Sequence, residues 1–347
     1  MQNKTKEQYN ISICILKIWM SFEVVLAHYR SWDETTKNVF GFGDILHRFV
    51  PVAVPAFMLL AFALTDVSKI SNLPKRMYRL VAPHVIWAII YYLVYRYFTI
   101  EYQKAYIYSK SDFLWQVFTG GSYNGTAWFQ AVLIYLTLLY SAIYLMPKKF
   151  ADKIIAFLTI ASLMLQYSGV NAHVFDAVEW PTQVFGGHFE DRYLVYVVGR
   201  YIEMIPYASI GIILSRQKWN INKKFFFVFP IISYLLLKME LLPVIDGYGY
   251  QGITLIIASV LLVVSALVIK VNIKDDVIQR LIEYISKRTM AIYFMHRLVA
   301  ESLYTTGILD KFMVPGSFRD CCIIWIISLI IALLFSFVPI KLIKTAF

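Results

Sequence analysis

The chain has 347 residues, of which 59% are hydrophobic and only 16% are charged, and its mean hydropathy is +0.61. These values exclude an ordinary soluble domain and a disordered chain. The formal net charge is +11, but no basic stripe or separate soluble domain accompanies it, so we expect no nucleic-acid partner.

Apolar segments of about 20 residues recur along the whole chain, which is the pattern of an all-α, polytopic integral membrane protein. Ten spans are predicted, at roughly residues 11–29, 45–64, 79–99, 127–146, 152–168, 194–215, 225–242, 250–270, 288–306 and 321–343. No soluble domain interrupts this pattern, so residues 1–347 are predicted to form a single domain embedded in the lipid bilayer.

The distribution of basic residues orients these spans. With the N-terminus in the cytoplasm, 20 Lys and Arg residues lie in or directly beside the six cytoplasmic segments, and seven lie in the five outer loops. Asp and Glu show the opposite bias, with six on the cytoplasmic side and 12 outside. This positive-inside pattern predicts that both termini are cytoplasmic and that the net charge reflects topology.

The first span, residues 11–29, follows a basic N-terminal stretch, as the apolar part of a signal peptide does. Its apolar run is too long for a signal peptide and contains Lys17 and Glu23, so we expect a retained helix. Lys17 and His28 are eleven residues apart, which is about 16 Å of helical rise and close to three turns, so they share one helix face.

Ionisable groups are costly inside a bilayer and usually face a polar cavity or a partner. His28 is a candidate general base, because its ordinary pKa lies near neutrality; the alternative is an ordinary histidine at a helix end. Lys17 either extends its ammonium group back to the cytoplasmic face or faces a polar channel, where it binds an anion or a carbonyl group.

Arg76 and Arg79 stand at the mouth of the third span in the string KRMYRLVAPH, three residues apart and therefore on one helix face. They either belong to the general excess of cytoplasmic basic residues or form a phosphate clamp, because guanidinium groups bind phosphate through paired hydrogen bonds. With a span that begins near residue 79, Pro83 falls within about the first turn, where proline is tolerated or makes a kink.

Two later spans contain groups of charged residues. Arg200 and Glu203 are three residues apart and are expected to neutralise each other. His296, Arg297 and Glu301 lie in the ninth span, which requires a polar cavity or partners. Arg297 and Glu301 have the spacing of an ion pair along a helix.

No pattern for a metal site or a disulfide is evident. Cys14, Cys321 and Cys322 lie in or beside spans without metal-ligand spacing. The outer loop at 169–193 is acidic and contains two histidines; it is interpreted as a solvated loop or as a partial lid over an extracytoplasmic substrate. Trp128, at the outer start of the fourth span, is typical of the aromatic belt at a membrane surface.

Five strings, in order along the chain, resemble the motifs of the acyltransferase-3 family of membrane acyltransferases. They are Lys17-x10-His28, VPAFMLLAF at 54–62, RLVAPH at 79–84, TAWF at 126–129 and TMAIYFMH at 289–296. The resemblance covers nearly the whole chain and agrees with ten spans. The resemblance rests on the five strings together, which follow the family's order on the expected helices.

Three features depart from the family pattern. Lysine stands at position 17, where the family usually has arginine, which keeps the charge but loses bidentate contact. Leu60 and Ala61 replace a small Ser-Gly pair, and Thr126 stands where the family has histidine. These differences indicate a divergent acceptor or a weakened enzyme.

The resemblance implies transfer of an acyl group, usually acetyl, from cytoplasmic acyl-CoA to a hydroxyl group of an extracytoplasmic glycan, at the bacterial cytoplasmic membrane. In such a membrane O-acyltransferase, His28 acts as the base or briefly carries the acyl group, and Lys17 positions or polarises the thioester carbonyl. Arg76 and Arg79 bind the CoA phosphates. The further candidates for acceptor or pocket residues are Trp128, Tyr293, His296 and Glu301. Acetyl-CoA is then a co-substrate, and no bound cofactor or metal is expected.

Two other functions fit ten helices with polar residues inside the membrane. One is a non-catalytic exporter or transporter of a glycan or lipid-linked intermediate, for which an internal repeat is the expected sign; the sequence contains no evident repeat. The other is a degenerate family member that acts as an assembly partner. The sequence carries no signal for an oligomeric state.

Overall fold

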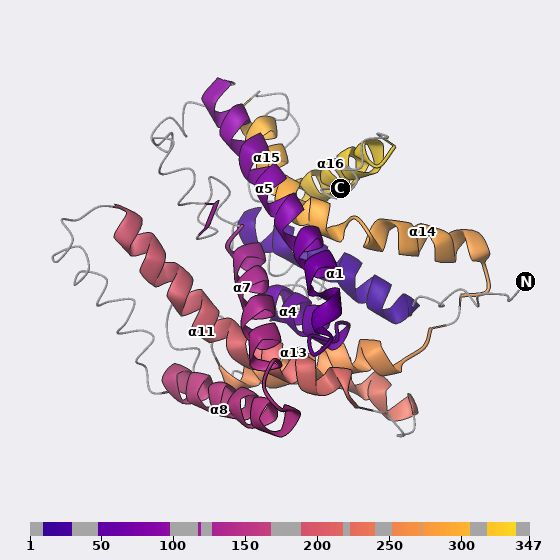
Figure 1. Ribbon diagram of the computed structural model, residues 1–347. Coiled ribbons are helices and arrows are strands. Elements are labelled where there is room, and N and C mark those ends of the chain that lie inside the picture. Colours follow the sequence, from indigo (N-terminus) through magenta and orange to yellow (C-terminus); the bar gives the residue numbers. More distant parts are fainter. Residues whose placement is uncertain are drawn as a thin grey trace, which may run out of the picture.

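The computed structural model describes residues 10–29, 48–97, 117–118, 127–167, 189–217, 223–239, 252–271, 273–305 and 318–337. Over this part of the chain the fold is 88% helix without a strand, so the predicted all-α class is confirmed. The α-helices, shown in Figure 1, are α1 (Ile11–Tyr29), α4 (Ala53–Ala63), α5 (Leu73–Tyr97), α7 (Trp128–Ile143), α8 (Lys148–Tyr167), α11 (Phe189–Ser215), α12 (Phe229–Met239), α13 (Ile253–Val268), α14 (Asp276–Ser286), α15 (Thr289–Thr305) and α16 (Phe318–Phe335). Short 3₁₀ segments are η1 (Val50–Val52), η2 (Ile70–Asn72) and η4 (Lys223–Val228).

Each of the ten predicted spans overlaps one of these helices. Among the described residues, the helices long and apolar enough to cross a membrane are Ile11–His28, Ile70–Val94 and Phe318–Phe335. Shorter apolar helices are Val50–Ala63, Trp128–Ile143, Phe226–Lys238 and Ile253–Val268. Ten crossings and cytoplasmic termini therefore stay predictions. Helix α14 falls in a segment that the sequence pattern left as a connection between two spans.

Helix α4 lies at the centre of the packing. It is apolar on all sides, and eight of its residues are buried, as expected for a helix enclosed by others. Helices α1, α11 and α13 pack against it (Figure 1). The site described below is built on one end of this central helix.

The contact between α4 and α11 is closest at Gly211. A Cβ atom at this position would lie 2.7 Å from the Leu59 carbonyl oxygen and 2.8 Å from the Phe62 Cβ atom. Both distances are shorter than side-chain carbons tolerate, so glycine is what allows the two backbones to approach. This close approach fixes how α11 packs against α4.

Helix α5 begins at Leu73, six residues before the predicted start of the span. Pro83 therefore lies inside the helix, and its expected position in the first turn is wrong. Proline has no N–H group to offer the carbonyl four residues earlier. The neighbouring Leu80 carbonyl accepts a hydrogen bond from Gln130 Nε2 of α7 at 2.8 Å. A side chain of α7 therefore binds the α5 backbone next to the hydrogen bond that Pro83 cannot make.

Helices α5 and α15 are joined by the buried Tyr91. Its hydroxyl donates to the Phe294 carbonyl at 2.7 Å and accepts from the Leu298 amide at 3.1 Å. Trp87, one turn earlier on α5, stacks on the Phe294 ring with the centroids 6.0 Å apart. These contacts hold the middle of α15, where His296 lies.

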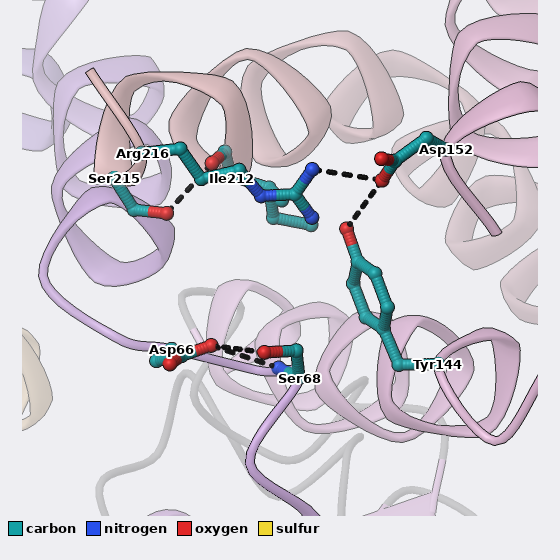
Figure 2. Close-up of polar contacts among 7 residues, drawn as sticks. All are labelled: Asp66, Ser68, Tyr144, Asp152, Ile212, Ser215 and Arg216. Carbon is teal, nitrogen blue, oxygen red and sulfur yellow. Dashed lines mark hydrogen bonds and ion pairs between the residues drawn. The ribbon is translucent and has the colours of Figure 1, made fainter. Parts of the chain in front are cut away.

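Figure 2 shows a polar cluster that joins several helix ends. Arg216, directly after α11, donates to Asp152 of α8 at 2.7 Å, and the Tyr144 hydroxyl at the end of α7 donates to the same oxygen at 3.3 Å. Asp66, in the loop after α4, lies in the same region (Figure 2). Its carboxylate accepts from the Ser68 hydroxyl and amide, and the hydroxyl bond lowers the pKa of Asp66. Three segments expected at the cytoplasmic face thus lie together.

Candidate active site

A cavity of about 230 Å³ lies beside Lys17 of α1. It is formed by α1, α4 with the turn that follows it, α7 and the start of α15. The lining residues are Lys17, Phe57, Leu60, Ala61, Leu64, Thr65, Phe129, Leu133, Lys287, Thr289, Met290 and Tyr293. The Lys17 side chain is half-buried and lines this mainly apolar space, and both interpretations of Lys17 stay predictions.

The lining combines an apolar part with a cationic part. Phe57, Leu60 and Phe129 belong to the apolar wall, whereas Lys17 and Lys287 contribute two ammonium groups. Hydroxyl groups are contributed by Thr65, Thr289 and Tyr293. Such a cavity can hold a ligand that has an apolar section and anionic or carbonyl oxygens.

Lys287 and Thr65 were not among the site residues predicted from the sequence. In the sequence, Lys287 is one more basic residue in a cytoplasmic segment. The structure places it at the C-cap of α14, two residues before α15 begins, with an exposed side chain at the edge of the cavity. No local motif signals that position, because it depends on how α14 meets α15.

His28 and His296 are brought together by the fold, although 268 residues separate them. Their ring centroids are 5.2 Å apart and the rings are tilted by 35°. His28 is exposed near the end of α1, whereas His296 is fully buried in α15. The predicted base therefore has a second imidazole beside it.

Tyr293 connects this pair of histidines to the cavity. Its ring lies 6.3 Å from the His296 ring and 5.6 Å from the Phe129 ring, measured between centroids. Tyr293 and Phe129 both line the cavity. A series of rings thus runs from the Lys17 cavity through Tyr293 and His296 to His28.

The orientation of His296 is set by its own helix. Its Nδ1 atom lies 3.2 Å from the Ile292 carbonyl oxygen. A carbonyl oxygen can only accept a hydrogen bond, so this geometry assigns the proton to Nδ1 in the neutral ring and leaves Nε2 as an acceptor.

The predicted arginine pair is not brought together at the cavity. Arg76 is partly buried against α4, where its Nη2 atom donates to the Ala61 carbonyl at 3.4 Å and its guanidinium carbon lies 5.3 Å from the Phe62 ring centroid. Ala61 lines the cavity, so Arg76 stands directly behind that wall. Its Nε and Nη1 atoms are buried without a hydrogen-bond partner in the described part of the chain. Arg79 is exposed and does not line the cavity.

Trp128 is buried at the start of α7 and does not have the exposed position of a membrane-belt residue. The Arg200 guanidinium carbon lies 5.1 Å from its ring centroid. Arg200 also forms an ion pair with Glu203, with 2.8 Å between Nη1 and Oε2. The predicted neutralising pair is therefore confirmed, and Trp128 packs against its cation.

The other charged residues of the spans also have partners. Arg297 and Glu301 form the predicted ion pair, with 2.8 Å between Nε and Oε1. Glu23, for which the sequence indicated no partner, accepts a hydrogen bond from Trp19 Nε1 at 2.7 Å. Glu301 was predicted as a possible acceptor or pocket residue. It does not line the cavity and instead pairs with Arg297.

In the described ranges, no group of three His, Cys, Asp or Glu side chains is arranged to hold a metal ion. Cys14 and Cys321 are buried and Cys322 is partly buried; all are free thiols. Most of the acidic outer loop, residues 168–188, lies outside the described residues, so its interpretation as a lid stays a prediction.

Comparison with known proteins assigns the chain to a family. The acyltransferase-3 family model, an acyltransferase domain, matches residues 10–341. No curated protein and no solved structure matches the chain. The family match covers every helix described above, including those that carry Lys17, His28, Tyr293 and His296. The chain therefore belongs to the acyltransferase-3 family of membrane acyltransferases.

Proposed function

We propose that this protein is a bacterial membrane O-acyltransferase that transfers an acyl group, most simply acetyl, from cytoplasmic acyl-CoA to a hydroxyl group of an extracytoplasmic glycan. The observation that carries the proposal is the connection between the Lys17 cavity and the histidine pair through Tyr293. One end of this series can hold a donor and the other can activate an acceptor.

The donor site is the cavity. An acyl-CoA has an apolar acyl group and a long arm in which methylene and methyl groups alternate with amide carbonyls, followed by several phosphates. The hydrocarbon parts match the apolar wall, and the carbonyl and phosphate oxygens match the two ammonium groups of Lys17 and Lys287.

Lys17 is the deeper of the two cations and is assigned to a carbonyl oxygen of the donor arm. It stands about 16 Å of helical rise from His28, so the thioester end of the donor is assigned to the far side of Tyr293, beside the histidine pair. Lys287, exposed at the edge, is assigned to the phosphates. Arg76, bonded to the Ala61 carbonyl behind the wall, is assigned to the support of that wall.

The chemical step is assigned to His28. As the acceptor hydroxyl oxygen attacks the thioester carbonyl carbon, the imidazole takes the hydroxyl proton. The carbon–sulfur bond breaks, and the proton passes to the leaving CoA sulfur, so that the products are an ester and the free thiol. His296 packs against His28 and holds the ring in place. In the alternative order, the neutral His28 imidazole attacks the thioester carbonyl carbon, the carbon–sulfur bond breaks and CoA leaves as the thiol with the imidazole proton. The acceptor hydroxyl then takes the acyl group from the acyl-imidazole, and its proton returns to the ring.

The first test is replacement of His28 by alanine in cells, with surface-glycan acetylation as the readout. Loss of a general base lowers the rate about 10²- to 10⁴-fold, so acetylation falls below detection while the protein level is maintained. Ile15→Ala is the matched control, because Ile15 is exposed on the same helix; acetylation stays normal in that variant. Normal acetylation in His28→Ala at normal protein level contradicts the assignment.

A second experiment separates acyl transfer from export. Purified protein in lipid nanodiscs is given radiolabelled acetyl-CoA and an acceptor glycan. An enzyme transfers label to the glycan in a His28-dependent manner. An exporter without chemistry transfers none, and that result would overturn the proposed reaction.

A further inference from the structure

Helix α14 is a short amphipathic helix between α13 and α15, seen beside α1 on the right of Figure 1. Its start is fixed by Asp275, whose Oδ1 atom accepts hydrogen bonds from the Val277 and Ile278 amides at 2.7 and 3.1 Å. A capping carboxylate of this kind defines the first turn. The segment is therefore an ordered helix rather than a simple connection.

One face of α14 is apolar and exposed. Val277, Ile278 and Leu281 lie on the same side of the helix and are 68%, 48% and 53% exposed. Three large apolar side chains on one short helix form a patch that monomeric soluble surfaces rarely leave open to water. Asp276, on the opposite side, is exposed as well, so α14 separates an apolar face from a polar one.

Contacts with helices that enter the membrane fix the position of α14. The Tyr284 hydroxyl and Ser336 Oγ, directly after α16, are 2.7 Å apart and share a hydrogen bond. Helix α16 is long and apolar enough to span a bilayer. The exposed Leu334 and Phe337 flank Ser336, with exposed fractions of 62% and 76%. The apolar face of α14 is thus close to the exposed apolar end of α16.

Basic side chains accompany the apolar face. Lys270 and Lys274 precede the helix, Arg280 lies within it, and all three are exposed. Lysine and arginine beside an apolar helix face are typical of segments that lie in the boundary between acyl chains and lipid phosphates.

We propose that α14 lies along the membrane surface, with Val277, Ile278 and Leu281 among the lipid acyl chains and Lys274 and Arg280 at the lipid phosphates. The occupant of the exposed face is the bilayer itself. This inference does not depend on the proposed reaction. It has a consequence for the cavity, because Lys287 at the C-cap of α14 lines the cavity edge, so lipid contact at α14 helps to hold that edge in place.

Site-directed spin labelling of the full chain tests this placement. Single cysteines replace Leu281 on the apolar face and Asp276 on the polar face, in a background where Cys14, Cys321 and Cys322 are serine. The protein is placed in nanodiscs of phosphatidylethanolamine and phosphatidylglycerol. Oxygen concentrates in the acyl region and a nickel chelate stays in water, so their relaxation effects report the depth of each label.

The expected result is a Leu281→Cys label that oxygen relaxes several-fold more effectively than the nickel chelate does, and the reverse for Asp276→Cys. A Leu281→Cys label that responds mainly to nickel is in water and overturns the proposal. A label that responds to neither reagent is covered by protein, either a second copy of this chain or another protein, and also overturns it. Labelling at Ile278 repeats the measurement if Leu281→Cys fails to fold.

Discussion

Lys17 and Lys287 come from opposite ends of the chain and line the same cavity. The position of Lys17 in an apolar span indicated that its ammonium group faces either a polar space or the membrane edge. The sequence alone did not distinguish these two positions. Its cavity could not be predicted, because the wall comes from α4, α7 and α15, which are distant in sequence. The proximity of His28 and His296 could not be predicted from the sequence either, because it depends on the packing of α1 against α15.

If the cavity holds the donor, Lys17 and Lys287 each contribute to the binding of acyl-CoA. Replacing either Lys17 or Lys287 with methionine keeps most of the side-chain length and removes the charge. A hydrogen bond to a charged group contributes about 1.5–3 kcal/mol, so KM for acyl-CoA is expected to rise about 10- to 100-fold in each variant. Lys17→Arg keeps the charge and retains more activity than Lys17→Met.

Steady-state kinetics of purified protein in nanodiscs measures both effects. Lys149→Met is the control, because Lys149 is exposed on α8 and does not line the cavity; its KM stays at the wild-type value. An unchanged KM in both Lys17→Met and Lys287→Met means that the donor binds elsewhere.

At the level of elements, the apolar pattern located all ten predicted helices but not their ends. Helix α5 starts six residues before the predicted span, because its first turns contain Lys75 and Arg76. A search for apolar spans does not include such polar residues. Helix α14 was missed for the same reason, since its charged face interrupts the apolar pattern. The packing of α4 against α11 depends on Gly211, whose importance becomes evident only when the partner backbone is present.

Replacement of Gly211 by alanine is expected to destabilise the protein. The added Cβ atom meets the Leu59 carbonyl and the Phe62 Cβ atom below 3.0 Å, and neither belongs to a flexible side-chain end, so α4 and α11 must separate. Overpacking of this kind typically costs about 1–3 kcal/mol. Thermal unfolding in detergent should show a lower midpoint for Gly211→Ala. Ile213→Ala, exposed on the same helix, keeps the wild-type midpoint; equal midpoints for both variants contradict the packing argument.

For the whole molecule, charge counting and helix packing point to the same arrangement. The segments after α4, between α7 and α8, and after α11 were each expected in the cytoplasm because of their basic residues. The Arg216, Asp152 and Tyr144 contacts bring the last two together, and the Asp66 loop lies in the same region (Figure 2). Helix packing gives relative positions only, so the side of the membrane rests on the positive-inside pattern.

A thiol-labelling experiment tests that sidedness. Single cysteines replace Ser68 and Lys149, which are exposed at the end expected in the cytoplasm, and Lys110, in an outer loop beyond the described residues. The native cysteines are changed to serine, and a membrane-impermeant maleimide is added to spheroplasts. We expect Lys110→Cys to react in intact spheroplasts, and Ser68→Cys and Lys149→Cys only after permeabilisation, because basic segments are retained in the cytoplasm. The reverse pattern inverts the topology and would place the Lys17 cavity on the outer side, away from cytoplasmic acyl-CoA. Reaction of all three positions in intact spheroplasts would contradict the packing of these segments relative to the bilayer.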